Sequence, residues 1–193
     1  MNSMELRNYP ISYLEDKKAE SLAPLMEAIE NYVITAKQDL ENMPAKMCRD
    51  SLLSEYNYRT RSKLKSCRSF GMTIAPGDIC YVDFGRAYVT EIGYQHFALV
   101  INVYCGKALV VPMTSNPVNY KQAYDSKSNP SGLKHLMRLG KLEGLYKYSV
   151  LFLNDAKFIN TARVIDLKAY LDPKSEQFQL IKKRLWECME VQL

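Results

Sequence analysis

The hydrophobic pattern of this chain changes its period near residue 72, and this change limits what the chain can fold into. In residues 12 to 43 apolar side chains recur at spacings of three and four, which is the period of a helix with one apolar face. From Met72 onward, short β-rich runs are separated by Gly, Pro, Asn and Asp. The pattern predicts an α+β chain, with a helical, basic extension over residues 1–70 and a mainly β domain over residues 71–193.

The first segment predicts one long amphipathic helix, or two joined near Ala23. Its apolar stripe consists of Leu22, Leu25, Met26, Ile29, Val33, Ala36 and Leu40. Pro24 fits the first turn of the main helix, and Pro44 follows its end. Such a stripe packs on the core of its own chain, serves dimerisation or binds a partner, and the sequence leaves these alternatives open.

The stretch from Ala45 to Phe70 is basic. It carries seven basic residues against two acidic ones, Asp50 and Glu55, with Tyr56 and Tyr58 among them. The basic residues are Lys46, Arg49, Arg59, Arg61, Lys63, Lys65 and Arg68. Cations neutralise phosphates and aromatic rings stack on bases, so this stretch suits a polyanion. The same composition is also typical of a solvated helix or linker.

The second half of the chain predicts a small sheet followed by a helix. The expected strands are Ile79–Phe84, Ala98–Val103, Ala108–Met113, Leu133–Leu139 and Val150–Leu153. A tight reversal at Cys105-Gly106-Lys107 makes the second and third of these a hairpin, and a loop spans Thr114 to Gly132. Apolar residues at helical spacing predict a closing amphipathic helix over Asp172–Val191.

Composition narrows the functional classes. The five cysteines form an odd set without a CxxC spacing, and only two histidines are present, so we expect reduced thiols, no metal site and no cofactor. No apolar run approaches the ~18 residues needed to cross a bilayer, and the first residues do not resemble a signal peptide. We therefore expect a cytoplasmic protein without a membrane segment.

Four ordered blocks of the β region resemble the MazF/PemK toxin family. Pro76–Gly85 is similar to the opening strand of the family, which runs from Gly-Asp to Val-Asp and then turns. The later blocks, at the family spacing, are Glu91 and Gly93 before Ala98–Ile101, then Val110–Ser115, then Ser149–Asp155 through Ile159 to Arg163-Val164. The resemblance covers about half of the chain and leaves residues 1 to 71 unexplained.

The resemblance implies a small, curved β-barrel of the MazF/PemK (CcdB-like) type over roughly residues 72 to 170. It also implies a metal-independent endoribonuclease that cuts single-stranded RNA, including mRNA, acts as a homodimer and is neutralised by a cognate antitoxin. An alternative is a noncatalytic barrel that binds RNA or a protein target. A third is a housekeeping RNA-binding or interaction protein whose helical extension is the partner surface.

The resemblance also implies site residues. His96 stands where the family has arginine, and a histidine, which titrates near ~6.5, performs acid or base chemistry directly. The family's strand-closing threonine is Thr114, followed by Ser115, and the acidic residue of the first loop is Glu91. The predicted RNA-binding residues are Arg86, Tyr94, Gln95, Lys134, His135, Arg138 and Lys157. Without the resemblance, a strand-end threonine is more typical of a hydroxyl that caps the backbone.

Overall fold

The computed structural model describes residues 3–8 and 14–190 of the chain. The chain divides into two compact units, residues 1–49 and residues 50–193, which are described separately. The division falls inside one helix, α4 (Ala45–Arg61), and not at the predicted boundary after residue 70. Residues 50–70 therefore belong with the sheet.

The first unit is helical. It contains α1 (Ser3–Arg7), a 3-10 helix (Ala19–Ser21), α3 (Ala23–Asn42) and the start of α4. The predicted main helix is confirmed: α3 begins with a proline in its first turn and ends just before Pro44. Residues 12 and 13 of the predicted segment lie outside the described residues. None of the α3 residues is buried.

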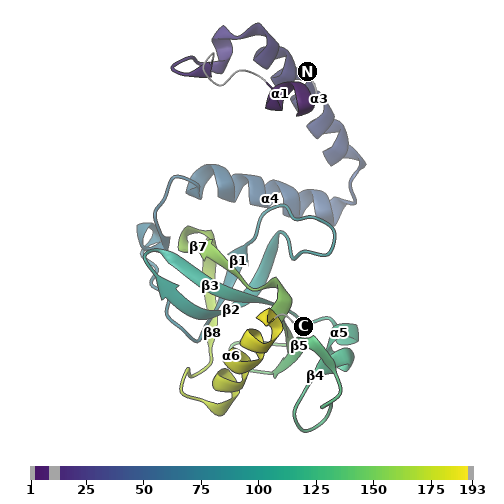
Figure 1. Ribbon diagram of the computed structural model, residues 1–193, viewed down its shortest axis with the longest axis vertical. Coiled ribbons are helices and arrows are strands. Elements are labelled where there is room, and N and C mark those ends of the chain that lie inside the picture. Colours follow the sequence, from purple (N-terminus) through teal and green to yellow (C-terminus); the bar gives the residue numbers. More distant parts are fainter. Residues whose placement is uncertain (1–2, 9–13, 191–193) are drawn as a thin grey trace. The chain divides into compact units, whose positions relative to one another are not determined.

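The second unit holds the sheet and two further helices (Figure 1). Its strands are β1 (Asp78–Asp83), β2 (Gln95–Tyr104), β3 (Lys107–Thr114), β4 (Ala123–Tyr124), β5 (Leu133–Gly140), β6 (Ser149–Phe152), β7 (Lys157–Asn160) and β8 (Val164–Tyr170). Its helices are α5 (Pro117–Gln122), α6 (Glu176–Met189) and the 3-10 turns Cys67–Phe70, Leu153–Asp155 and Thr161–Arg163. No helix in the described part of the chain is both long and apolar enough to cross a membrane.

Strand β3 is the centre of the sheet. The strand order is β4-β5-β6-β3-β2-β1-β8, and β7 pairs with the first half of β3 while β6 pairs with its end. All pairs are antiparallel except β4 with β5, so the sheet is mixed. The α+β class with a mainly β core, a C-terminal helix and N-terminal helices is confirmed.

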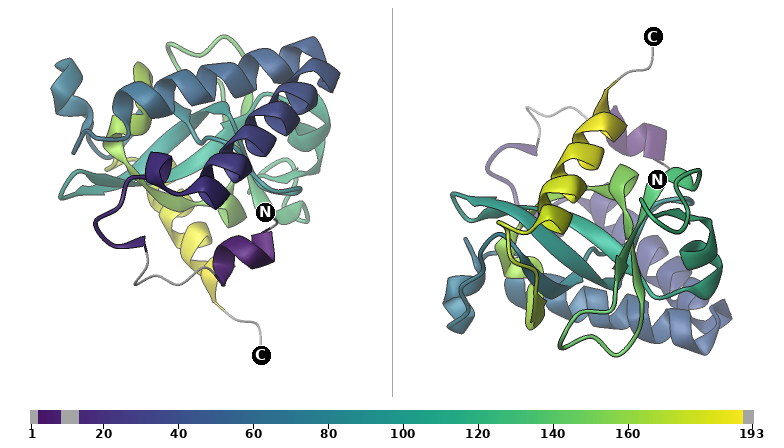
Figure 2. Two further views of the ribbon diagram at one scale, coloured as in Figure 1. Left: turned by 90° about the horizontal axis from the view of Figure 1, so that it is seen from above. Right: turned by 90° about the horizontal axis from the view of Figure 1, so that it is seen from below.

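The two faces of the sheet carry separate apolar clusters, as the alternation of side chains requires. One cluster joins Leu99, Val111 and Leu151 to Phe178 and Ile181 of α6. Figure 2 shows α6 lying along this side of the strands. The other cluster contains, on the opposite face, Val82, Ala98, Val100, Val110 and Ile159. The continuous apolar runs of β2 and β3 therefore reflect burial on both faces.

Four elements were not predicted. The expected loop from residue 114 to 132 contains α5 and β4, and the segment after β6 contains β7 and β8. Of the seven residues of β8, only Val164 is buried, because β8 is an edge strand with mostly exposed side chains. Neither β4, of two residues, nor β7, of four, is long enough to give a periodic signal.

The second half of α4 is bonded to the sheet through side chains. The Ser54 hydroxyl donates to Asp83 Oδ1 at 2.7 Å, and the Asn57 amide donates to Asp83 Oδ2 at 2.8 Å. Arg61 Nη1 donates to the carbonyls of Ala162 and Val164 at 3.2 and 2.7 Å. These contacts explain why residues 50–70 belong to the second unit.

Two truncations test this boundary. We expect a chain starting at residue 50 to fold with nearly the melting temperature of the full chain. A chain starting at residue 71 should melt at least ~5 °C lower or aggregate, since it loses every bond from α4 to Asp83 and to the backbone near Val164. Circular dichroism melting of both proteins measures this. Equal melting temperatures would restore the boundary at residue 70.

Burial also predicts cysteine reactivity. Burial, assisted by the charge of Asp78, raises the pKa of the Cys80 thiol to about 12, whereas Cys105 lies exposed in the β2–β3 turn. Iodoacetamide at pH 8 should modify Cys105 and spare Cys80, because the thiolate is the nucleophile. Peptide mass spectrometry reads out each site, and denatured protein is the control in which both react. Rapid labelling of Cys80 in the native protein would contradict its burial.

Candidate active site

The β2–β3 ladder ends beside His96 and Thr114. Phe97 of β2 and Met113 of β3 are its last pair, and His96 and Thr114 are the next residues beyond that pair on the two strands. The same row continues through Val82, which pairs with His96. Residues of one row point to the same face of a sheet. Both His96 and Thr114 are half-buried, so the row offers an imidazole and a hydroxyl at a partly open surface.

Thr114 and Ser115 stand where β3 ends. Thr114 Oγ1 accepts the backbone N–H of Asn116 at 3.2 Å, which is the backbone-capping role expected of a strand-end threonine. Its own hydroxyl proton is left to donate elsewhere. Asn116 in turn caps α5 by accepting from the N–H of Val118. Ser115 is exposed between these caps, so the two hydroxyls lie on a turn fixed from both sides.

Glu91 and Lys157 line one hollow of about 360 Å³. The other residues that line it are Thr90, Asn154, Asp155 and Ala156. Lys157 pairs with Val110, four residues before Thr114 on the same face of β3, which corresponds to about 13 Å along the strand. Its ammonium lies 5.6 Å from the Phe84 ring centroid. The exposed Glu91 accepts the N–H of Tyr88 at 3.3 Å, which closes a turn in the loop.

The β1–β2 loop positions three of the predicted residues differently. Tyr94 closes the loop with its backbone, accepting from Phe84 at 2.7 Å and donating to Gly85 at 2.6 Å, with φ at 57°. Gln95 donates to Ser54 Oγ at 2.7 Å and to Asp83 Oδ1 at 3.4 Å. Its side chain therefore holds α4 to the sheet and is not directed to a ligand. Arg86 is exposed in the loop.

Strand β5 carries the remaining predicted residues. Arg138 pairs with Val150, which pairs with Thr114, so it lies in the same row as the candidate catalytic pair. Its guanidinium is engaged, since it donates to the carbonyls of Tyr120 and Lys121 and stacks on the Tyr120 ring at 4.6 Å. Lys134 is exposed at the start of the strand.

The second histidine, His135, is exposed on β5. By alternation it shares the face of Met137, which packs in the α6 cluster, and that face is opposite to the one that carries the row of Thr114. The structure therefore does not bring the two histidines of the chain together. Among the described residues, no group of three or more His, Cys, Asp or Glu side chains is arranged to hold a metal ion.

Sequence reasoning missed the buried carboxylate of Asp83. It is 3% exposed and accepts from Ser54, Asn57, Gln95 and the N–H of Gly85. The sequence gives Asp83 as part of a strand motif, but two of its donors, Ser54 and Asn57, come from a helix more than twenty residues away in the chain. No spacing rule connects these positions. Arg163, whose Nη1 donates to the Asp83 carbonyl at 3.1 Å, was missed for the same reason.

No protein-family model and no curated protein matches the chain. Among solved structures, it is similar to MazF of Deinococcus radiodurans, with 14% identity and a TM-score of 0.44 over 61% of this chain and 97% of the other. The toxin MazF-mt6 of Mycobacterium tuberculosis has 12% identity and a TM-score of 0.41, over 60% of this chain and 99% of the toxin. A MazE-MazF structure from D. radiodurans has 14% identity to this chain and a TM-score of 0.42, over 61% of this chain and 96% of the other.

The bonding of Gln95 and Arg138 predicts structural effects. Replacing either residue by alanine should lower the free energy of unfolding by about 1–3 kcal/mol, because acceptors that are now bonded lose their donors. Urea unfolding followed by circular dichroism measures this. Lys147→Ala, on an exposed side chain, is the matched control and should change stability by less than about 0.5 kcal/mol. Unchanged stability together with lost RNA affinity would instead assign the two residues to RNA.

Proposed function

We propose that the chain is a metal-independent endoribonuclease that cleaves single-stranded RNA, with His96, Thr114, Ser115 and Glu91 as its catalytic residues. The observation that supports the proposal is that His96 and Thr114, both half-buried, directly follow the last residue pair of the adjacent strands β2 and β3. An imidazole near a fixed hydroxyl, at the ends of two central strands, combines a group that transfers protons with a hydroxyl that can donate a hydrogen bond to phosphate. The resemblance of four sequence blocks to the MazF/PemK toxins supports this assignment, with His96 standing where the family has arginine.

The proposed reaction is an internal transfer of the phosphodiester. A base removes the proton of the 2′-hydroxyl, the 2′-oxygen bonds to phosphorus, and the bond from phosphorus to the 5′-oxygen breaks. An acid protonates the leaving 5′-oxygen, so the products are a 2′,3′-cyclic phosphate and a 5′-hydroxyl. His96 performs one of these proton transfers and Glu91 supports it or performs the other. The hydroxyls of Thr114 and Ser115 donate to the phosphate oxygens.

Among the predicted RNA-binding residues, the proposal gives Lys157 the main role. It shares the face of Thr114 along β3 and lines the hollow that holds Glu91. Lys134 lies on the same face of β5 as Arg138. We propose that it extends the positively charged path for RNA beyond Arg138 and its cross-strand neighbours. Gln95 and Arg138 contribute to the site by positioning its strands, since their donors are bonded internally.

A noncatalytic RNA-binding barrel is the second candidate. The observation that favours it is the capping bond of Thr114, whose Oγ1 accepts the Asn116 N–H. A threonine that serves the fold needs no catalytic role. This candidate predicts bound, intact RNA and an affinity that falls steeply with salt.

We further propose that the active form is a homodimer in the cytoplasm and that a protein antitoxin restrains it. The MazE-MazF structure similar to this chain is named for two components. In this chain, α3 buries none of its residues and exposes Ile29, Tyr32, Val33 and Ile34 at 43–63% of their surfaces. Exposed apolar side chains on one helix give a partner protein apolar surface to cover.

The decisive measurement is cleavage of a labelled single-stranded RNA in EDTA. The wild-type protein should produce discrete fragments that end in 2′,3′-cyclic phosphate. His96→Ala should slow cleavage by about 10²- to 10⁴-fold, because proton transfer contributes about this much. Thr114→Val should also slow cleavage, because the variant lacks the hydroxyl that donates a hydrogen bond to the phosphate.

His135→Ala is the matched control, since it removes the other histidine on the opposite face of the sheet. It should retain wild-type cleavage. Intact RNA with every protein, together with salt-sensitive binding, would replace the nuclease by the noncatalytic candidate. Equal loss in both histidine variants would remove the assignment of His96.

A further inference from the structure

A pocket of about 410 Å³ lies in the second unit, between the second half of α4 and the end of β1. It is lined by Ser51, Ser54, Glu55, Asn57, Tyr58, Arg61 and Ser62 from α4 and the residue after it, by Asp83 to Arg86, and by Asn160, Ala162 and Arg163. Neither His96 nor Thr114 lines it. The volume falls in the range of small-molecule sites, which is about 300–1,000 Å³.

Three guanidinium groups line this pocket. Arg61 and Arg163 each use Nη1 to hold backbone carbonyls, of Ala162, Val164 and Asp83. These bonds fix the two guanidinium groups, and Arg61 also lies 4.2 Å from the Phe70 ring centroid. Arg86 is exposed and lines the pocket. Fixed guanidinium forks are the groups that proteins use to bind phosphate through paired hydrogen bonds.

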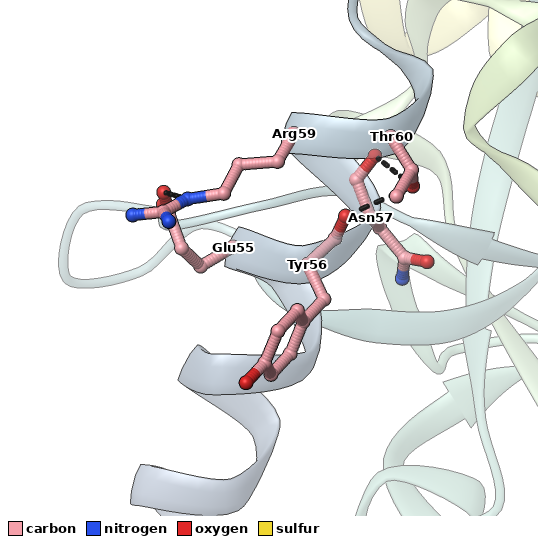
Figure 3. A network of polar contacts seen from close by, with 5 residues as sticks. All are labelled: Glu55, Tyr56, Asn57, Arg59 and Thr60. Atoms are coloured by element: carbon pink, nitrogen blue, oxygen red, sulfur yellow. Dashed lines mark hydrogen bonds and ion pairs between the residues drawn. The ribbon is translucent and has the colours of Figure 1, made fainter.

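The two acidic residues at the pocket do not cancel this charge. Asp83 is buried and its carboxylate accepts from Ser54, Asn57 and the Gly85 N–H. Glu55 is paired with Arg59 at 2.7 Å along α4, as Figure 3 shows, with the Asn57 side chain directed to the strands from another side of the helix. The pocket therefore retains an excess of positive charge.

We propose that this pocket binds a nucleotide, with its phosphate on Arg86 and Arg163 and its base beside Tyr58. Tyr58 is 64% exposed and gives a base an aromatic face on which to stack. Inorganic phosphate alone would leave most of the volume empty. A free nucleoside monophosphate and a nucleotide within an RNA strand share this chemistry. The inference does not depend on the nuclease proposal.

The test is isothermal titration of the full-length protein with each of the four nucleoside 5′-monophosphates. At least one should bind. Arg163→Ala should weaken its binding about tenfold or more, as expected for a lost charge-assisted hydrogen bond. Lys174→Ala, which removes one exposed positive charge on another segment, is the matched control and should bind as the wild type does. Unchanged affinity in Arg163→Ala would overturn the proposal.

Tyr58→Ala separates binding from folding. It should leave the melting temperature nearly unchanged, since the side chain is 64% exposed, and still weaken the nucleotide. Unaltered affinity in this variant would remove Tyr58 from the site. Inorganic phosphate that binds as tightly as the nucleotide would overturn the assignment of a base-binding site.

Competition distinguishes the two sources of the nucleotide. Displacement of the monophosphate by a short single-stranded RNA supports a nucleotide within a strand, and no displacement supports a free nucleotide. Neither His96 nor Thr114 lines the pocket, so nucleotide binding and RNA cleavage are tested at different residues. A failure of RNA cleavage therefore leaves this inference standing, and a failure of nucleotide binding leaves the nuclease proposal standing.

Discussion

The buried residue Asp83 connects α4, β2 and Arg163 in the second unit. It accepts hydrogen bonds from Ser54 and Asn57 of α4 and from Gln95 of β2, while the carbonyl of the same residue accepts from Arg163. A charge is tolerated in a core only when donors replace its lost water. The Asp83 carboxylate at the end of β1 therefore requires the donors that α4 supplies. It also bonds Gly85 and Gln95, which lie at the two ends of the β1–β2 loop, and so fixes both ends of that loop.

This constraint explains why the two candidate sites are separate although they share a loop. At the start of the loop, Gly85 donates its N–H to Asp83, and Arg86 follows at the edge of the nucleotide pocket. At its far side, Glu91 lines the hollow with Lys157. His96 comes just after Gln95, whose amide is bonded to the Asp83 network. The same network thus fixes the base of the proposed active site and one wall of the pocket.

The sequence was sufficient to predict what depends on period and local chemistry. The β2–β3 hairpin, its turn at Cys105-Gly106, α3 and α6 all follow from such signals. The short or edge strands β4, β7 and β8 carry no comparable pattern, because few of their side chains are buried and their pairing is decided by distant residues. The closeness of His96 to Thr114 also followed in principle, since a hairpin register determines it.

The roles of the charged residues were less predictable, because a charge in a sequence does not reveal its partner. Arg138 was expected to bind RNA and is instead bonded to carbonyls around α5. Arg163 was noted only as part of a family-like block, and it lines the pocket together with Arg61 and Arg86. The basic stretch from Ala45 to Phe70 divides in the same way: Arg61 binds the backbone near Val164, and Arg59 pairs with Glu55. The composition of this stretch is typical of a segment that binds a polyanion and also of a solvated helix. One side of α4 is bonded to the sheet and lines the pocket, so the contacts of this side, and not the number of positive charges, determine where an anion can bind.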